Sequence, residues 1–140
     1  MRLLIILALL ASSSANAKDW VVIHDAPDFL LSMDSEEISQ DGNLRKGWIM
    51  WEYAEPRLMP RASPQDPERY FVRVWELTSF NCQERKAATV EVIHWAKHSR
   101  ILNRAERDAT GNYTEVVPES LGAFILESVC GWSLDSKPRT

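Results

Sequence analysis

The sequence predicts an α+β domain: a twisted antiparallel sheet of about six strands, with a C-terminal helix packed on one face and tethered by a disulfide. Three observations predict this class. Short runs rich in β-branched and aromatic residues follow one another between turn signals. The periodicity becomes helical only near the C-terminus. The chain also contains two cysteines, Cys82 and Cys130.

The N-terminal residues 1–17 have the pattern of a cleaved secretory signal peptide. Arg2 precedes an apolar run over 3–11, and Ala-Asn-Ala at 15–17 fits a signal-peptidase site. The apolar run is too short to span a bilayer, and the alternative is an uncleaved N-terminal anchor. We therefore expect an exported chain, periplasmic or secreted, with a single domain over 18–140 and no later transmembrane segment.

The two cysteines are expected to form one disulfide. An oxidising compartment favours bridged over free thiols, and two cysteines allow only one internal pairing. The alternative is a pair of buried thiols. A Cys82–Cys130 bridge would close a loop of about 49 residues, worth on the order of 4 kcal/mol in the chain-entropy model.

The N-terminal half is expected to contribute three strands. The runs 19–25 and 29–34 are rich in apolar β formers and are separated by Pro27. After the turn signal Asp-Gly-Asn at 41–43, the run 44–53 places aromatic residues on both of its faces. This pattern indicates a central strand that is covered at least partly on each side.

The segment 54–69 is expected to be a long loop between two strands. Its prolines argue against a helix or an inner strand, and they are Pro56, Pro60, Pro64 and Pro67. A connection of this length is uncommon in a compact domain and is often a binding element. Leu58 and Met59 at its centre would be exposed unless they fold back or meet a partner.

The second half is expected to supply the central hairpin and the helix. The two longest β-rich runs, 70–80 and 87–96, are joined by a polar turn, and a further strand is expected over 99–104. From Pro118 to Cys130 the apolar residues instead recur at helical spacing. Pro118 suits the first turn of this helix.

Gly131 suits the left-handed position just past the end of the helix. At least four of the six tryptophans are expected to be mainly buried.

Motifs for catalysis, metal binding and phosphate binding are missing from the sequence. His94 and His98 are four residues apart, but on a strand they would be separated by roughly 13 Å, too far to share one ion. We therefore expect no enzyme activity, no cofactor and no metal site. The remaining catalytic alternative is a hydrolase in which His24 or His94 meets carboxylates in one cleft. The net charge of −4 argues against nucleic-acid binding.

Basic and apolar side chains in two segments are the candidates for partner binding. They are Arg57, Leu58, Met59, Arg61, Arg100 and Arg104. Their expected ligand is a protein or an acidic polysaccharide. The alternative is that the cations only solubilise a loop and an edge strand. Exposed sheet edges also make a homodimer possible.

The order of the elements resembles the surface-adhesin protein E family of exported bacterial domains, over nearly all of 19–132. The residues that carry the resemblance are FLLSMDSEEI, GWIMWEYAEP, SFNC followed by the basic turn QERK, and VVPESLGAFILESVC. The resemblance implies a bent antiparallel sheet with a C-terminal helix fastened across its concave side by one disulfide. It also implies binding of host matrix or plasma proteins. The sequence departs from surface-displayed members because it lacks a lipid-anchor cysteine at its signal junction.

These observations together favour a non-catalytic exported binding protein of this adhesin-like family. Its partner would be a host or envelope protein or an acidic matrix polymer. The alternative is a periplasmic small-ligand carrier or envelope accessory protein, which would need a tryptophan-lined pocket beside the helix. A fully packed interface between helix and sheet would argue against the carrier.

Overall fold

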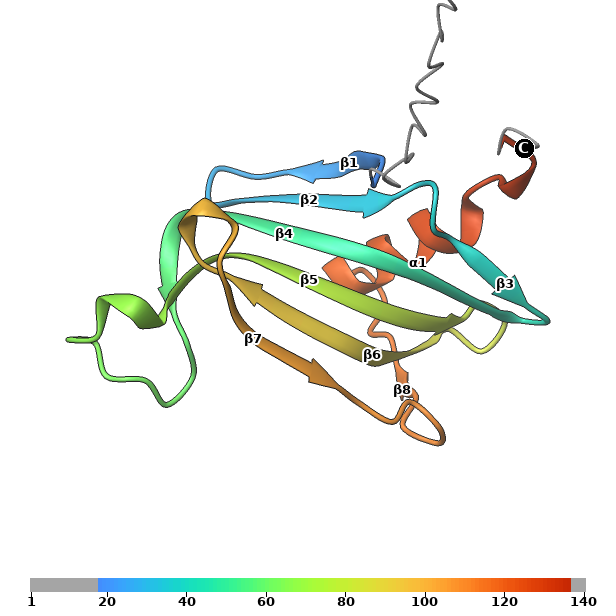
Figure 1. Ribbon diagram of the computed structural model, residues 1–140. Coiled ribbons are helices and arrows are strands. Elements are labelled where there is room, and N and C mark those ends of the chain that lie inside the picture. The colour runs from blue at the N-terminus through green and yellow to red at the C-terminus, as the bar shows by residue number, and fades with distance from the viewer. Residues whose placement is uncertain (1–17, 137–140) are drawn as a thin grey trace, which may run out of the picture.

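A computed structural model describes residues 18–136, and the expected signal peptide over 1–17 lies outside the described residues. Within this part of the chain, one antiparallel sheet of eight strands is followed by the C-terminal helix α1, Leu121–Gly131 (Figure 1). The strands are β1 (Trp20–Asp25), β2 (Phe29–Asp34), β3 (Ser39–Asp41), β4 (Leu44–Leu58), β5 (Tyr70–Asn81), β6 (Lys86–Trp95), β7 (Ile101–Glu106) and β8 (Thr114–Glu115). Their order along the sheet is β1-β2-β4-β5-β6-β7, with β3 paired to β4 and β8 paired to β6.

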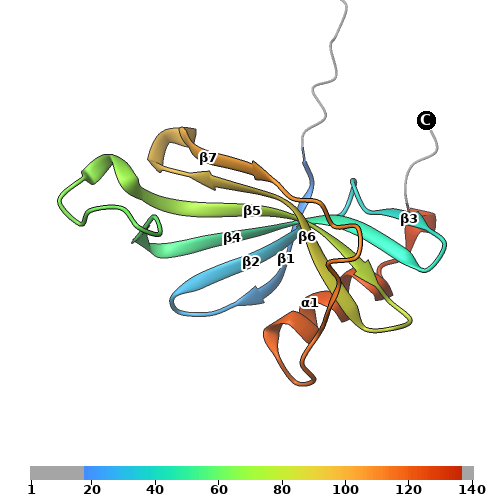
Figure 2. The ribbon, with the colours of Figure 1, turned by 90° about the horizontal axis from the view of Figure 1, so that it is seen from below.

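The long strands β4 and β5 form the centre of the sheet. They pair from Leu44 opposite Asn81 to Leu58 opposite Tyr70, and so run through the whole length of the domain. The sheet is strongly twisted, and its strands fan out on both sides of a crossing point near the middle (Figure 2). The six strands of the main order confirm the expected α+β class.

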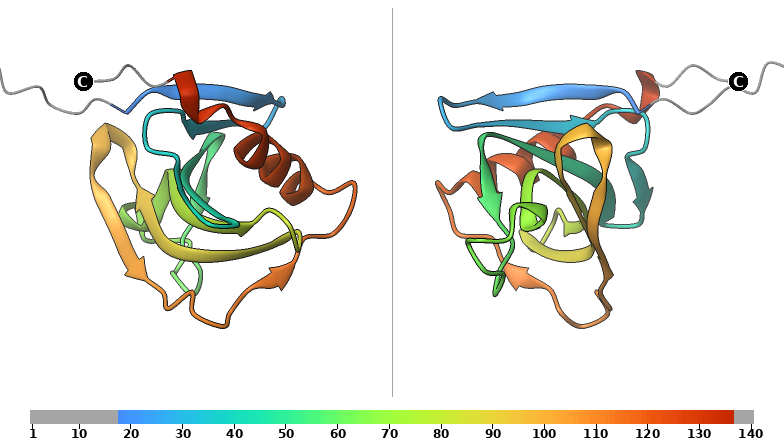
Figure 3. Two further views of the ribbon diagram at one scale, coloured as in Figure 1. Left: turned by 90° about the vertical axis from the view of Figure 1, so that its right-hand side faces the viewer. Right: turned by 60° about the vertical axis from the view of Figure 1, so that its left-hand side comes forward.

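Helix α1 packs on one face of the sheet at one end of β4 and β5, along one side of the curved sheet (Figure 3). Its inward residues Leu126 and Val129 are 2% and 0% exposed. They lie in one cluster with sheet residues, which are Leu31, Met33, Ile38, Ile49 and Phe80. The helix therefore closes the main hydrophobic core.

The disulfide expected from the sequence is confirmed. Cys82 and Cys130 are bonded with their Cα atoms 5.8 Å apart, which ties the last turn of α1 to the end of β5. Beside the bridge, the Cys82 amide donates to the Asn43 carbonyl at 3.1 Å. The end of the helix is thus fixed to both central strands.

The ends of α1 differ in detail from the expectation. Ser120 is the N-cap, and its hydroxyl accepts from the Ala123 amide at 3.1 Å, so Pro118 lies before the helix and not in its first turn. Gly131 is the last helical residue, and the left-handed conformation expected just past the end is wrong. Arg45 explains the difference.

The Arg45 guanidinium donates to the carbonyls of Val129 at 2.9 Å and Trp132 at 2.6 Å. These bonds give the carbonyl groups at the C-terminus of the helix a charged donor, in addition to the Trp132 amide that donates to Val129, so a left-handed turn is not needed to satisfy them.

The expectation that the whole of 54–69 is a loop is wrong for its first part. Strand β4 continues to Leu58, although its register is broken between Glu52 and Arg57. The pairing of β2 with β4 stops at Tyr53, and the pairing of β4 with β5 resumes only at Arg57, so residues 54–56 have no ladder partner. Pro56 lies within this stretch, where its missing amide hydrogen removes no bond to a second strand.

All six tryptophans are partly buried, and none belongs to the fully buried core. Trp20, Trp48 and Trp95 surround Trp75 on the face away from the helix, with ring centroids 5.2, 6.4 and 4.8 Å from that of Trp75. The Lys18 ammonium lies 4.9 Å from the centroid of Trp48. Both faces of the central strands are therefore covered by aromatic or apolar side chains.

Candidate binding site

A groove lies between the loop that follows β4 and the turn that follows β6. These two segments are at the end of the sheet remote from α1 (Figure 1). We call it the distal groove. Its volume is about 740 Å³, within the range of ligand-binding sites. The residues that matter most for its chemistry are Pro56, Pro64, Pro67, Tyr70, Lys97 and Arg100.

The loop wall of the distal groove is held by local hydrogen bonds. The Tyr70 hydroxyl donates to the Pro64 carbonyl at 3.1 Å. Asp66 caps a short 3-10 helix, Pro67–Arg69, by accepting from the Glu68 amide at 3.0 Å. These contacts fix the loop before any partner binds, which lowers the ordering cost of binding.

The two walls of the groove are joined by one charged contact. The Arg100 guanidinium lies 2.9 Å from the Glu68 carboxylate and also donates to the Glu68 carbonyl at 3.2 Å. Arg100 is the residue directly after the 3-10 turn that follows β6, whereas Glu68 belongs to the proline-rich loop. The contact therefore joins the two segments that the sequence singled out separately.

Most cations at this end of the molecule are already paired with a carboxylate. Arg57 lies 3.8 Å from Asp28, and its guanidinium carbon stands 4.1 Å from the centre of the Tyr53 ring. Among residues 18–136, Arg61 and Lys97 form no ion pair. The positive charge left for a ligand is therefore small.

Of the six candidate binding residues named from the sequence, Arg100 lines the distal groove, and the other five are not among its lining residues. Arg57, Leu58, Met59 and Arg61 lie at the distal end of β4 and in the loop after it, and Arg100 lies across the groove.

Met59 is not presented to solvent as an apolar tip. It folds back onto the cluster of Phe71, Val74 and Val92.

Arg104 is separate from this group. It lies on β7 and pairs with Glu91 of β6. The groove also contains residues that sequence reasoning did not select, namely Tyr70, Val72 and Ala96. Tyr70, Val72 and Ala96 belong to the strands expected over 70–80 and 87–96, and no sequence signal distinguishes them from other strand residues.

The three histidines have different surroundings. His24 contacts the rings of Phe29 and Phe124, with centroids 5.6 and 6.0 Å away. His94 lies against Phe71, and burial lowers the pKa of its imidazole. His98 is exposed in the turn after β6. In the part of the chain that the structure describes, no group of three or more His, Cys, Asp or Glu side chains is placed to hold a metal ion.

The comparisons with known proteins bear on this arrangement. Within residues 18–136, none of the helices has the length and apolar character needed to cross a membrane. No curated protein sequence matches the chain. The family model described as Surface-adhesin protein E matches residues 20–131. The chain therefore belongs to the surface-adhesin protein E family, which indicates an exported or surface protein with an adhesin-like binding role rather than an enzymatic one.

Proposed function

We propose that this protein is a non-catalytic exported adhesin that binds a protein partner through the distal groove. The observation that carries the proposal is a preformed groove at the end of the sheet remote from the helix and the disulfide. Binding residues are commonly found on loops that a rigid scaffold positions. Here β4 and β5 provide that scaffold.

The side chains of the distal groove suit a polypeptide. Pro56, Pro64, Pro67 and the ring of Tyr70 offer rigid apolar surface, which loses little conformational entropy when a partner covers it. Gln65 and the backbone of the loop provide hydrogen-bonding groups beside this surface. Lys97 at the groove and Arg61 in the loop favour a partner segment that carries acidic residues.

A protein partner fits the charges better than an acidic polysaccharide does. Binding such a polymer by electrostatics needs a concentrated positive field. Arg57, Arg69 and Arg100 each lie within 4 Å of a carboxylate, at 3.8, 3.6 and 2.9 Å, so this end of the molecule is close to neutral. Apolar contacts must therefore supply much of the affinity.

The small-ligand carrier is not favoured. It needs a pocket beside the helix, but the inward residues Ile125, Leu126 and Val129 of α1 are only 8%, 2% and 0% exposed. They fill the space between helix and sheet with side chains.

The proposal is tested by binding of the full-length mature protein to an immobilised basement-membrane protein extract, with immobilised heparin as a second probe. The variants are Lys97→Glu and Tyr70→Ala, and Arg85→Glu is a matched charge reversal at the opposite end of β5. In the described part of the chain, 18–136, Arg85 pairs only with exposed Glu127, so its reversal should cost little stability.

We expect the wild-type protein to bind the extract saturably. In both groove variants the affinity should fall at least about tenfold, which corresponds to a loss of about 1.4 kcal/mol of binding free energy. The affinity of Arg85→Glu should equal that of the wild type. Thermal unfolding of each variant would show that the fold is intact. Binding to heparin alone, or equal binding by all variants, would refute a protein-binding distal groove.

A further inference from the structure

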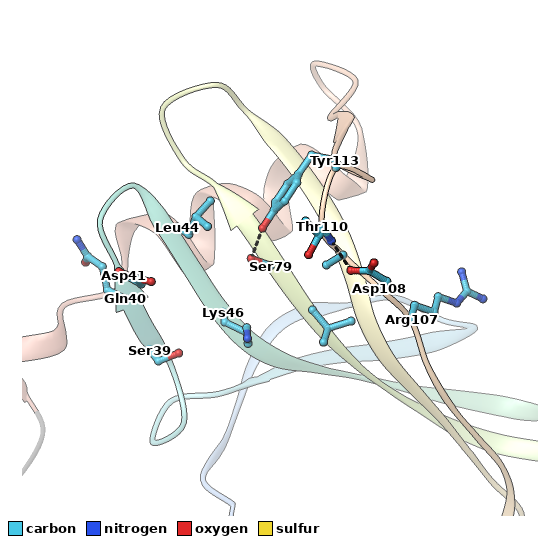
Figure 4. Close-up of a pocket in the computed structure, with 13 residues that line it drawn as sticks. Ser39, Gln40, Asp41, Leu44, Lys46, Ser79, Arg107, Asp108, Thr110 and Tyr113 are labelled. Atoms are coloured by element: carbon cyan, nitrogen blue, oxygen red, sulfur yellow. Dashed lines mark hydrogen bonds between the residues drawn. The ribbon is translucent and has the colours of Figure 1, made fainter.

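A second groove lies at the other end of the sheet, on the side of β3 and the loop 107–113. Figure 4 shows its two walls, one from the β3–β4 hairpin and one from this loop, with Ser79 of β5 between them. Its volume is about 690 Å³, which is in the range of small-molecule sites. None of its lining residues belongs to the distal groove.

The loop wall of the second groove is held in place by its own hydrogen bonds. Asp108 accepts from the Thr110 amide at 2.8 Å, and the Asn112 side chain donates to the Asp108 carbonyl at 2.7 Å. The hydroxyls of Tyr113 and Ser79 are 2.7 Å apart, which ties the loop to β5 (Figure 4). The groove is therefore formed without a ligand.

Charged side chains belong to both walls of the second groove. Asp41 and Lys46 belong to the hairpin wall, and Asp108 and Arg107 belong to the loop wall, where the Arg107 guanidinium points away from the hairpin (Figure 4). Within residues 18–136 none of these four side chains forms an ion pair. Hydrogen bonds from Thr110 hold the pKa of Asp108 below its usual value, so this carboxylate stays ionised at neutral pH.

The charges and hydroxyls of the groove select the chemistry of its ligand. Asp41 and Lys46 balance each other, and the Asp108 carboxylate already accepts from the Thr110 amide, so the groove has no strong preference for an anionic or a cationic ligand. Donors and acceptors nevertheless stand on both walls, and the hydroxyls of Ser39 and Thr110 add to them. A neutral molecule with many hydroxyl groups matches this pattern, because each hydroxyl both donates and accepts.

We infer that the second groove is a binding site for a neutral saccharide, about the size of a disaccharide, with the Tyr113 ring as the apolar surface against a sugar face. Carboxylates and cations make stronger hydrogen bonds than neutral groups do, so Asp41 and Lys46 supply the orienting contacts from the hairpin wall. The site is independent of the distal groove and of the proposed adhesion.

The test uses four neutral disaccharides, namely maltose, lactose, cellobiose and di-N-acetylchitobiose, added separately to the mature protein labelled with nitrogen-15. Chemical-shift changes in two-dimensional NMR spectra locate any binding. The double variant Asp41→Asn, Lys46→Met removes both charged groups of one wall, and Lys97→Glu in the distal groove is the control. The side chains of Asp41 and Lys46 are both exposed, so the double variant should keep its fold.

We expect at least one disaccharide to shift the amides of Ser79 and of the loop 107–113. The double variant should weaken this binding by about tenfold or more, as for loss of a charge-assisted hydrogen bond, and Lys97→Glu should leave it unchanged.

Three results would overturn the inference. They are an absence of shifts at the groove with all four sugars, shifts that persist unchanged in the double variant, and binding at the groove of heparin fragments in preference to the neutral sugars. A failure of adhesion to matrix extract would leave these spectra unaffected, so the two proposals can fail separately.

Discussion

Replacing both Cys82 and Cys130 with serine should lower the free energy of unfolding by about 4 kcal/mol. The bridge joins residues 48 apart in the sequence, and the entropy of closing a loop of that size in the unfolded chain gives this figure. A domain of ordinary size is stable by only about 5–15 kcal/mol. The bridge should thus account for a large share of the total.

The folded structure itself should survive the double substitution. The Ser120 cap, the Arg45 contacts and the burial of Leu126 and Val129 do not depend on the sulfur atoms. Most of the loss should therefore arise from greater freedom of the unfolded chain. The Ser/Ser variant should also have a somewhat larger m-value in urea unfolding, because an unbridged unfolded chain exposes more surface than a bridged one.

Urea unfolding followed by tryptophan fluorescence and by far-ultraviolet circular dichroism measures this loss. Reducing agent should shift the midpoint of the wild type to that of the Ser/Ser variant, and it should leave the variant unchanged. A loss of less than about 1 kcal/mol, well below the loop-entropy figure, would refute the reasoning. So would a helical signal that disappears before the fluorescence transition, because the helix would then depend on the bridge.

Three further predictions concern the packing and the charges of the fold. Leu126→Ala should cost about 2–5 kcal/mol of stability in urea unfolding, because its side chain is 2% exposed, whereas Glu127→Ala on the exposed side should have little effect. Lys18→Met should lower the free energy of unfolding by about 1–3 kcal/mol, between the values for surface and buried ion pairs. The reason is that the Asp34 side chain is 0% exposed and lies 3.2 Å from the Lys18 ammonium. An unchanged urea midpoint would contradict this prediction. Burial raises the pKa of Glu76 above its usual value, against a hydrogen bond from Trp51 that lowers it. The ionised carboxylate therefore opposes folding, so Glu76→Gln should stabilise the protein at pH 7, and the gain should vanish as the pH falls below the range of an unfolded carboxyl, about 4. A gain that does not change with pH in urea titrations would contradict this explanation.

The sequence predicted the elements that depend on local pattern. The runs 70–80 and 87–96 correspond to β5 and β6 with shifts of about one residue at their ends, because long stretches of β-branched and aromatic residues have few alternatives. The bridge followed from the number of cysteines and from the expected compartment. The helical period near the C-terminus was likewise a property of neighbouring residues.

The elements that the sequence missed depend on distant neighbours. Strands β3 and β8 contain only three and two residues, and each exists because β4 or β6 lies beside it. Predicting that β4 continues past Pro56 would have required knowing that the pairing of β2 with β4 ends before this proline. No local signal carries that information, because the cost of a proline depends on whether a second strand is present.

The distal groove could not be predicted from the sequence for a related reason. Tyr70 begins β5 and Ala96 follows β6, about 26 residues later, and they meet only because these strands are antiparallel. Sequence reasoning selected cations in both segments. It could not show that Glu68 neutralises Arg100, and this pairing is why we propose a protein partner rather than the acidic polysaccharide that was expected as its equal.

The same two strands explain how one small domain combines a stable core with a presented loop. At one end of β4 and β5, the helix, the bridge and the fully buried cluster fix the fold. At the other end, the distal groove depends on the local bond of Tyr70 to Pro64 and on the contact of Arg100 with Glu68 across the groove. Because β4 and β5 pair towards both ends, with one break between Glu52 and Arg57, the loop is attached to the sheet and not to a flexible linker. For the proposed partner, a loop that is already ordered lowers the entropic cost of binding, and this offsets the small number of free charges in the groove.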